Sequence, residues 1–309
     1  MLVGPLPACP GVTLPPEALH LPFEAGPFRM AMGLLSCPAS ALIELDERYP
    51  AEMAGRRALL ADRHADVFAA CAGSAPAGAE ALALLAAHLP ARYPGWFRRD
   101  GTMLHNALTG EAWDLAAPPC DPLELAGRLV QEDLCIVRPD AGGPVLDAAI
   151  LCAPSRWLLA EKIGRPLLAI HAPVPLYADR LGAPVDRFMR QLKPGRVAMR
   201  MNWSVMDDAA LFQTGGKHRT ERDPTITAAN AGARLHLRVE RQTLSRLPRS
   251  GSVLFTIRVH SYALARIAAL PGAPARLAAA VRALPAELAA YKSLPAFRDA
   301  LLAYLDARA

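Results

Sequence analysis

Hydrophobic positions change their spacing twice along this chain, from a helical period to alternation and back to a helical period. From Pro38 to Arg92, apolar residues recur at the three- and four-residue spacing of helices that bury one face. Residues 1–38 are rich in proline and glycine and show no sustained period, so we expect an extended arm over the surface. The first third of the sequence is thus predicted to be an arm followed by helices.

Alternation of apolar and polar residues, or short apolar runs, predicts strands further along the chain. The predicted strands are, in order, residues 133–138, 145–152, 166–170, 196–205, 235–244 and 253–260. Helical spacing covers residues 122–131 and returns after the last strand. Residues 213–232 have no period, which is typical of a lid or a disordered segment.

Runs of helices, then strands, then helices favour an α+β fold with an antiparallel sheet over a repeated βαβ pattern. We therefore predict one α+β domain, residues 39–309, in which helices before and after the strands flank the sheet. The extended arm, residues 1–38, precedes this domain.

Composition narrows the class of protein. The 309-residue chain is 52% hydrophobic and 20% charged, which is enough apolar material for a sizeable core. Its six cysteines are scattered singly, which suits a reducing compartment and argues against iron–sulfur clusters held by thiolates. We see no signal-peptide pattern and no membrane-spanning apolar stretch, and we expect a cytoplasmic protein. The bias toward arginine and alanine is typical of bacterial coding sequences of high GC content.

Several catalytic motifs are missing, and each absence weighs against a function class. The sequence contains no GxGxxG, no P-loop, no GxSxG and no HExxH, which weakens the readings as a dinucleotide-dependent enzyme, an NTPase, a serine hydrolase or a zinc protease. The net charge of +5 comes without a nucleic-acid-binding module, so we expect no nucleic-acid partner. Electrons for any redox reaction would have to come from a separate protein, and the basic excess suits an acidic one.

His171 lies in the most distinctive segment, which runs from Glu161 to Pro175. We expect residues 167–170 to form a buried strand that delivers His171 to its end. Pro173 and Pro175 forbid a following helix and are predicted to hold the chain extended. A histidine fixed in this way suits an axial metal ligand, although a core histidine bonded to a carbonyl group gives the same pattern.

The strand at 235–244 carries charged residues on both faces. With a period of two, Arg241 shares a face with leucine and valine, while His236, Arg238 and Glu240 share the other. Charges placed in this way suggest a binding role. The alternative is a solvated face, with Arg241 extending its guanidinium group to the edge of the sheet.

The strand at 196–205 repeats this arrangement, because Arg200 and Asn202 alternate with Met201 and Trp203. Such a polar face would donate hydrogen bonds to a ligand that carries carboxylates. It is also compatible with the solvent side of a sheet.

A set of separated motifs, found in a fixed order, resembles the heme-dependent oxidative N-demethylase family. The motifs are Val130–Cys135, Pro154–Trp157, Glu161–Gly164, Ile170–Pro175, Arg200–Trp203 and Arg238–Leu244. The similarity extends from about Pro22 to about Tyr262. The resemblance implies a PAS-like antiparallel sheet wrapped by helices and a bound heme b. It also implies oxygen activation and the oxidation of an N-methyl group with release of formaldehyde.

Residue roles follow from the same resemblance. His171 is expected to be the axial iron ligand, with His236 and His260 as reserve candidates. Guanidinium groups match carboxylates in shape and charge, so Arg200, Arg238 and Arg241 are expected to pair with the heme propionates. Glu240 is the candidate catalytic residue, which holds a cationic amine or relays protons.

The resemblance therefore predicts a monooxygenase subunit that demethylates a small secondary or tertiary amine with O2. Its electrons would come from NAD(P)H through a separate reductase with flavin and iron–sulfur components, which this sequence lacks. Two alternatives stay open. One is a heme-PAS protein that senses or carries a ligand without catalysis, and the other is an interaction domain that has lost heme.

Overall fold

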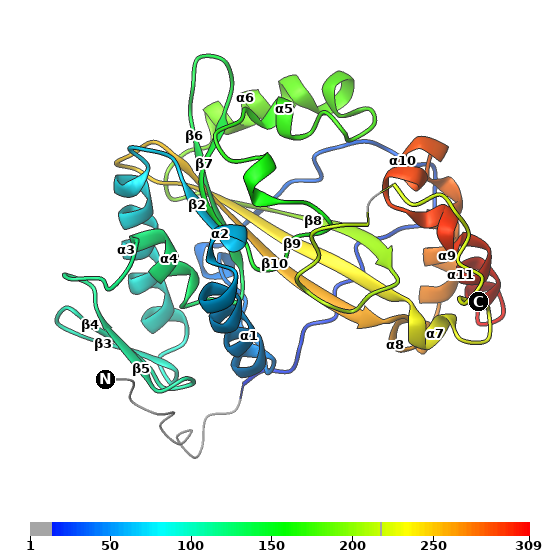
Figure 1. Ribbon diagram of the computed structural model, residues 1–309, viewed down its shortest axis with the longest axis horizontal. Helices are drawn as coiled ribbons and strands as arrows, with labels where there is room; N and C mark the ends of the chain where they lie inside the picture. The colour runs from blue at the N-terminus through cyan, green and yellow to red at the C-terminus, as the bar shows by residue number, and fades with distance from the viewer. Residues whose placement is uncertain (1–13, 217) are drawn as a thin grey trace.

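A long hairpin lies at the centre of the fold. The computed structural model describes residues 14–216 and 218–309, and in it β9 (His236–Arg246) pairs with β10 (Val253–Ala263) over eleven residues each (Figure 1). Gly251, with φ of +70°, adopts the left-handed conformation that the turn requires. The hairpin is the middle of a seven-stranded antiparallel sheet with the order β1-β8-β9-β10-β6-β7-β2.

The other elements of the chain surround this hairpin. The remaining strands are β1 (Leu35–Cys37), β2 (Phe68–Ala70), β3 (Phe97–Asp100), β4 (Met103–Asn106), β5 (Glu111–Asp114), β6 (Asp133–Arg138), β7 (Val145–Ile150) and β8 (Val197–Met206). The α-helices are α1 (Tyr49–Asp62), α2 (His64–Val67), α3 (Ala75–Arg92), α4 (Pro122–Gly127), α5 (Leu167–Ile170), α6 (Ala183–Gln191), α7 (Ala231–Arg234), α8 (Leu264–Ala268), α9 (Ala273–Ala283), α10 (Ala286–Tyr291) and α11 (Arg298–Asp306). Short 3-10 turns are η1 (Ala39–Ala41), η2 (Leu159–Glu161) and η4 (Leu294–Ala296), and η3 (Ala178–Gly182) is a π-helical turn.

The sheet has two covered faces, which we name after the helices packed on them. On the α5 face, Leu244 of β9 packs with Leu167 and Ile170 of α5 and with Met189 of α6. On the α1 face, the carbonyl group of Leu42, in the segment that leads to α1, accepts a hydrogen bond from Thr243. Because side chains alternate along a strand, even-numbered residues of β9 lie on the α5 face and odd-numbered residues on the α1 face.

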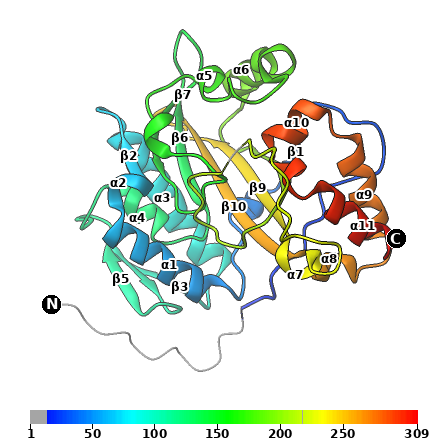
Figure 2. The ribbon, with the colours of Figure 1, turned by 45° about the vertical axis from the view of Figure 1, so that its right-hand side comes forward.

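Helices from both ends of the sequence cover the α1 face. The C-terminal helices α7, α8, α9 and α11 bury Leu237 and Val239 at one end of β9, and they lie together on the right of the view in Figure 1. Helices α1 and α3 and the three-stranded sheet β3-β4-β5 lie at the opposite side of the molecule, while α5 and α6 form a separate group, as the turned view in Figure 2 shows. The sheet is therefore buried on both sides, although each side is covered by several separate elements.

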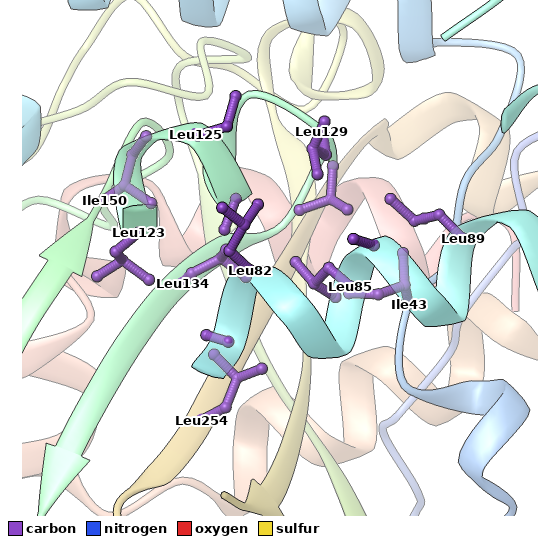
Figure 3. Close-up of a cluster of buried hydrophobic side chains, with 14 of the residues drawn as sticks. Ile43, Leu82, Leu85, Leu89, Leu123, Leu125, Leu129, Leu134, Ile150 and Leu254 are labelled. Atoms are coloured by element: carbon purple, nitrogen blue, oxygen red, sulfur yellow. The ribbon is translucent and has the colours of Figure 1, made fainter. Parts of the chain in front are cut away.

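The largest apolar core lies between the N-terminal helices and strands β6, β7 and β10. Figure 3 shows leucine and isoleucine side chains from α3, α4 and the strands that meet there. The labelled residues are Ile43, Leu82, Leu85, Leu89, Leu123, Leu125, Leu129, Leu134, Ile150 and Leu254. Their burial explains the helical period of the N-terminal region, since α3 directs one apolar side into this core.

The predicted α+β class with an antiparallel sheet is confirmed, and so are the three long strands. The part of the predicted arm that the structure describes, residues 14–38, contains only the short strand β1, and residues 1–13 lie outside the described residues. In the predicted helical region 38–92, the first α-helix begins only at Tyr49, and β2 interrupts the helices. Within the described chain, no helix combines the length and apolar character needed to cross a bilayer.

The prediction of a strand at residues 167–170 was wrong. These residues form the single helical turn α5, which begins after Pro166 in an extended conformation. Four apolar residues are too few to reveal a period, so a buried strand and a buried helical turn look alike in the sequence. The predicted extended chain after His171 was also wrong, because residues 171–177 form successive turns closed by backbone hydrogen bonds from Val174 to His171 and from Tyr177 to Val174.

Gly127, at the end of α4, lies against Ile150 of β7. A β-carbon at residue 127 would come within 2.5 Å of two side-chain atoms of Ile150, which is fully buried. We predict that Gly127→Ala lowers the free energy of unfolding by about 1–3 kcal/mol, because overpacking strains a full core. Gly55→Ala is the matched control. Gly55 lies in α1 with open space around its Cα, so this change should raise stability by up to about 1 kcal/mol. Urea unfolding followed by circular dichroism measures both, and a Gly127→Ala variant as stable as the wild type would contradict the packing.

Candidate functional site

His171 is held at the end of α5 by two contacts. Its Nδ1 atom lies 2.8 Å from the carbonyl oxygen of Leu167, one turn earlier. Because a carbonyl group only accepts hydrogen bonds, Nδ1 carries the proton. The imidazole ring also stacks on Tyr177, with ring centroids 4.3 Å apart and an angle of 11° between the planes. Nε2 is therefore the nitrogen through which this side chain would bind a metal.

The packing of α5 places His171 over the α5 face of the sheet. Leu167 and Ile170 are buried in the same core as Leu244 of β9 and Val253 of β10. His171 itself is half-buried. His171, at the end of α5, thus lies near the polar side chains that β8 and β9 direct toward the α5 face.

Arg200 is one of these polar side chains, and it has a buried polar atom without a partner in the described chain. It lies on β8, opposite Gln242 of β9, and its buried Nε atom has no hydrogen-bond partner among residues 14–216 and 218–309. Burial lowers the pKa of Arg200, while the negative charge of Glu240 and the Tyr177 hydroxyl group act in the opposite direction. Arg200 therefore interacts electrostatically both with Glu240 and with Tyr177, the residue that stacks on His171.

Glu240 lies on β9, two residues before Gln242 and on the same face of the sheet as Arg200. It accepts hydrogen bonds from three side chains. Asn202 of β8 donates at 3.4 Å, Gln242 donates at 3.0 Å, and the hydroxyl group of Ser155 donates a short hydrogen bond. Burial raises the pKa of Glu240, but the Ser155 hydrogen bond and the positive charge of Arg238 outweigh it, and the net shift is downward. Glu240 is therefore a carboxylate at neutral pH, held in one orientation.

Arg238 joins the sheet to two loops. It is 1% exposed, and its guanidinium group donates to Ser155 Oγ at 2.9 Å. It also donates to the carbonyl groups of Ala153, Ala210 and Leu211 at 2.9–3.0 Å. These bonds use both terminal nitrogens and Nε, so Arg238 acts mainly as a structural cross-link, and it reaches Glu240 through Ser155.

Arg241 and His260 lie on the α1 face, away from His171. The guanidinium group of Arg241 bonds to the carbonyl group of Ala41, and its Nε is 3.2 Å from Glu44 Oε2. His260, which is 1% exposed, lies near Glu44 and Glu17. Burial lowers the pKa of His260, but these two carboxylates outweigh burial and raise it overall.

His236 remains on the α5 face with Arg238 and Glu240, as the alternation of β9 predicts. It is half-buried at the start of the strand, and burial lowers its pKa. Its Nδ1 atom is buried and lacks a hydrogen-bond partner within the described part of the chain. The structure therefore brings His171, Arg200, Arg238, Glu240 and His236 to one side of the sheet, and it separates Arg241 and His260 from them.

Sequence reasoning missed Tyr177 and Ser155 as members of this site. Ser155 receives a hydrogen bond from Arg238 and donates one to Glu240, and Tyr177 supports His171. Ser155 does fall inside the motif Pro154–Trp157, which was a signal of its position. Tyr177 ends the segment of turns after His171. The wrong prediction of an extended chain there placed Tyr177 too far from His171 to be recognised as its neighbour.

Comparison with family models matches residues 33–302 to the family described as haem-dependent oxidative N-demethylase, alpha subunit-like. The chain belongs to this family. The match covers most of the sequence and includes every residue assigned to the α5 face. Membership connects this chain to heme-dependent oxidoreductases, and the alpha-subunit description connects it to assemblies with other components.

The residues on the α5 face fit the chemistry of an iron porphyrin. An imidazole whose Nδ1 donates to a carbonyl group offers Nε2 to iron. The buried Nε atom of Arg200, without a partner in the described chain, offers a donor to a propionate. The α5 face thus places an imidazole that is bonded through Nδ1 and a buried guanidinium donor on one side of the sheet, which is the donor set that an iron porphyrin requires.

The two arginines of the α5 face should differ in their contribution to stability. Arg238→Met should lower the free energy of unfolding by about 3 kcal/mol or more, because several buried carbonyl groups would lose their donor. Arg200→Met is the matched control and should change stability by less than about 1 kcal/mol in protein without heme, since its buried Nε atom has no hydrogen-bond partner to lose within the described chain. Chemical denaturation of the apoprotein measures both. Equal losses from the two substitutions would show that Arg200 is also a structural residue.

Proposed function

We propose that this chain binds one heme b on the α5 face and catalyses oxidative N-demethylation of a small secondary or tertiary amine. The observation that carries the proposal is the arrangement of His171, Arg200 and Glu240 on one side of the sheet in a member of this family. When bound, the heme iron supplies oxygen activation and oxidation of an N-methyl group, which leaves as formaldehyde.

In this proposal, His171 would hold the heme iron. The Leu167 carbonyl group and the Tyr177 ring fix the orientation of the imidazole. A hydrogen bond from Nδ1 to an acceptor raises the basicity of the other nitrogen and strengthens its bond to a metal. His171 is therefore the metal ligand, and His236, on the same face, is the reserve candidate.

Arg200 is the first partner for a heme propionate. A planar guanidinium group donates two parallel hydrogen bonds to a carboxylate, and this pairing gains strength where water is excluded. Arg238 is fully engaged by loop carbonyl groups, so its contribution is to hold Ser155 and the loop around residue 210 in place. Arg241 lies on the α1 face and is not part of the proposed heme contact.

Glu240 is proposed to bind the protonated amine. A cation that leaves water for a buried site loses its hydration, and a fixed carboxylate offsets that cost. Ser155, Asn202 and Gln242 hold the carboxylate so that a bound amine takes one orientation. Positioning of this kind favours reaction at one methyl group. Glu240 also offers an acceptor for a proton released by the amine.

Electrons are proposed to arrive from a separate reductase that carries flavin and iron–sulfur groups and uses NAD(P)H. The sequence contains no dinucleotide fingerprint, and its cysteines are scattered. The alpha-subunit description of the family is consistent with further components. The net charge of +5 favours an acidic partner, whose association would weaken as salt is added.

Replacement of His171 tests the ligand. His171→Ala should weaken heme binding by more than the roughly 10- to 100-fold that loss of a supporting hydrogen bond costs at a metal site. Titration of apoprotein with hemin, followed at the Soret band and after dithionite and carbon monoxide, measures the affinity. His105→Ala, which changes a half-buried histidine of the small sheet β3-β4-β5, is the control and should bind heme normally. Unchanged spectra in His171→Ala would transfer the assignment to His236.

Glu240→Gln tests the amine site. The variant should keep its heme, while the amine concentration that gives a half-maximal spectral shift should rise about tenfold or more, because a charge-assisted contact is lost. Dimethylamine and trimethylamine are suitable probes, and formaldehyde release with a chemical reductant and O2 gives the turnover. Glu161→Gln, at an exposed carboxylate, is the control. Normal amine shifts in Glu240→Gln would remove Glu240 from the site, and amine shifts without formaldehyde in the wild type would favour a sensor or carrier.

A further inference from the structure

A second group of metal-type ligands lies on the α1 face, on the other side of the sheet from His171. It consists of His20 from the N-terminal arm, Glu44 from the segment before α1, and His260 from β10. One ligand atom from each residue lies within 4.8 Å of the other two. Glu44 Oε1 is 2.9 Å from His20 Nε2 and 3.1 Å from His260 Nε2. Three segments far apart in the sequence therefore converge on one point.

The spacing of these atoms is close to that of a metal site. Two imidazole nitrogens and one carboxylate oxygen are a common ligand set for zinc and similar first-row ions. With metal–ligand bonds of about 2.1 Å, neighbouring ligand atoms in a tetrahedral site are about 3.4 Å apart. The two contacts of Glu44 are only slightly shorter than this distance, so small side-chain rotations would admit an ion.

His260 provides independent support, because it is fully buried and poorly satisfied. Its side chain is 0% exposed, and neither ring nitrogen makes a hydrogen bond to any residue that the structure describes. Glu44 Oε1 is close to Nε2, and Glu17 Oε1 lies 3.6 Å from Nδ1, yet neither contact has hydrogen-bond geometry. An ion bound next to Glu44 would give Nε2 of this buried imidazole a partner that the described residues do not supply.

The surroundings of the three ligands match the supporting contacts of known types of metal site. Histidine ligands usually donate their second nitrogen to a carboxylate, and Glu17 Oε1, 3.6 Å from His260 Nδ1, would need only a small movement to accept such a bond. Carboxylate ligands are in turn held by a second contact, which Arg241 provides at 3.2 Å from Glu44 Oε2. The side chains of Glu44 and His20 are 23% and 16% exposed, so the ligands are reachable from solvent.

The positive charges nearby do not prevent cation binding. Arg241 and Arg258 are the buried arginines of this region, and each is already paired with carboxylates, Arg258 with Asp46 and Glu52. Glu17 is a further buried carboxylate, and it pairs with Arg266 at 2.5 Å. Burial raises the pKa of Glu132 to about 7, so Glu132 is only partly ionised at neutral pH. A bound ion would therefore be held by the charge of Glu44 and by the lone pairs of the two imidazole rings.

We propose that His20, Glu44 and His260 bind one divalent first-row transition ion, such as Zn2+, which fixes the N-terminal arm to the sheet. The ion would have a structural role, because it would join residue 20 of the arm to β10 at the centre of the fold. The site is separate from the proposed heme site and does not depend on it. Heme spectra and zinc content therefore report on the two sites independently.

Zinc binding to the heme-loaded protein tests this proposal. After dialysis against a chelator, the protein is equilibrated with Zn2+, and bound zinc is measured by mass spectrometry of the metal. We expect about one zinc per chain with a higher melting temperature, and we expect His20→Gln to weaken zinc binding by about tenfold or more. His64→Gln is the matched control. His64 also pairs with a glutamate, Glu124, at 2.8 Å, but among residues 14–216 and 218–309 it belongs to no group of three ligands, so this variant should bind zinc as the wild type does.

Two outcomes would overturn the proposal. One is a wild-type protein that binds no zinc, and the other is equal zinc content in the wild type and His20→Gln. Either would assign the cluster to a protonated His260 that is held by Glu17 and Glu44 without a metal. His20 is only partly buried and lies in the arm, so His20→Gln should fold, and an unchanged far-UV circular dichroism spectrum confirms that it has.

Discussion

The alternation of side chains along β9 and β10 is the constraint on which the rest of this structure depends. The hairpin is covered on both faces, so its arginines Arg238, Arg241 and Arg258 are withdrawn from water. Removing a charge from water costs several kcal/mol unless a partner compensates. The chain meets this requirement twice, with separate partners on each face. Arg238 and Glu240 are matched on the α5 face, and Arg241 and Arg258 on the α1 face.

The two polar layers have different characters. On the α1 face, charged residues pair with one another, as when Arg258 holds both Asp46 and Glu52. Their function is chiefly to attach α1 and the arm to the sheet. On the α5 face, the partners are mostly backbone carbonyl groups of loops and neutral side chains, and Arg200 keeps a buried nitrogen with no partner among the described residues. In the proposed heme site a propionate would accept from this donor, whereas the atoms without described partners on the α1 face, among them both ring nitrogens of His260, surround the proposed metal site.

The sequence predicted those features that depend on long periodic segments. Alternation over ten residues located β8 and β9, and an eight-residue run rich in β-branched residues located β10. The alternation along β9 also assigned Arg238 and Glu240 to one face and Arg241 to the other. The four-residue strands β3, β4 and β5 were missed, and α5 was mistaken for a strand, since four residues carry no readable period. The contacts of Arg238 could not be predicted, because its main acceptors are carbonyl groups, which every residue type possesses. The meeting of His20, Glu44 and His260 likewise depends on tertiary packing between distant segments.

The order of strands in the sheet has a consequence for how this protein is made. Its edge strands β1 and β2 come from the first seventy residues, whereas the central hairpin ends at Ala263. On a ribosome, α1 and α3 emerge long before the strands that bury their apolar sides. Pairing between such distant segments is slow, and uncovered apolar surface favours aggregation. The apolar sides of the N-terminal helices therefore stay uncovered until β10 has been synthesised, and this interval is the stage of synthesis at which the chain is most exposed to wrong associations.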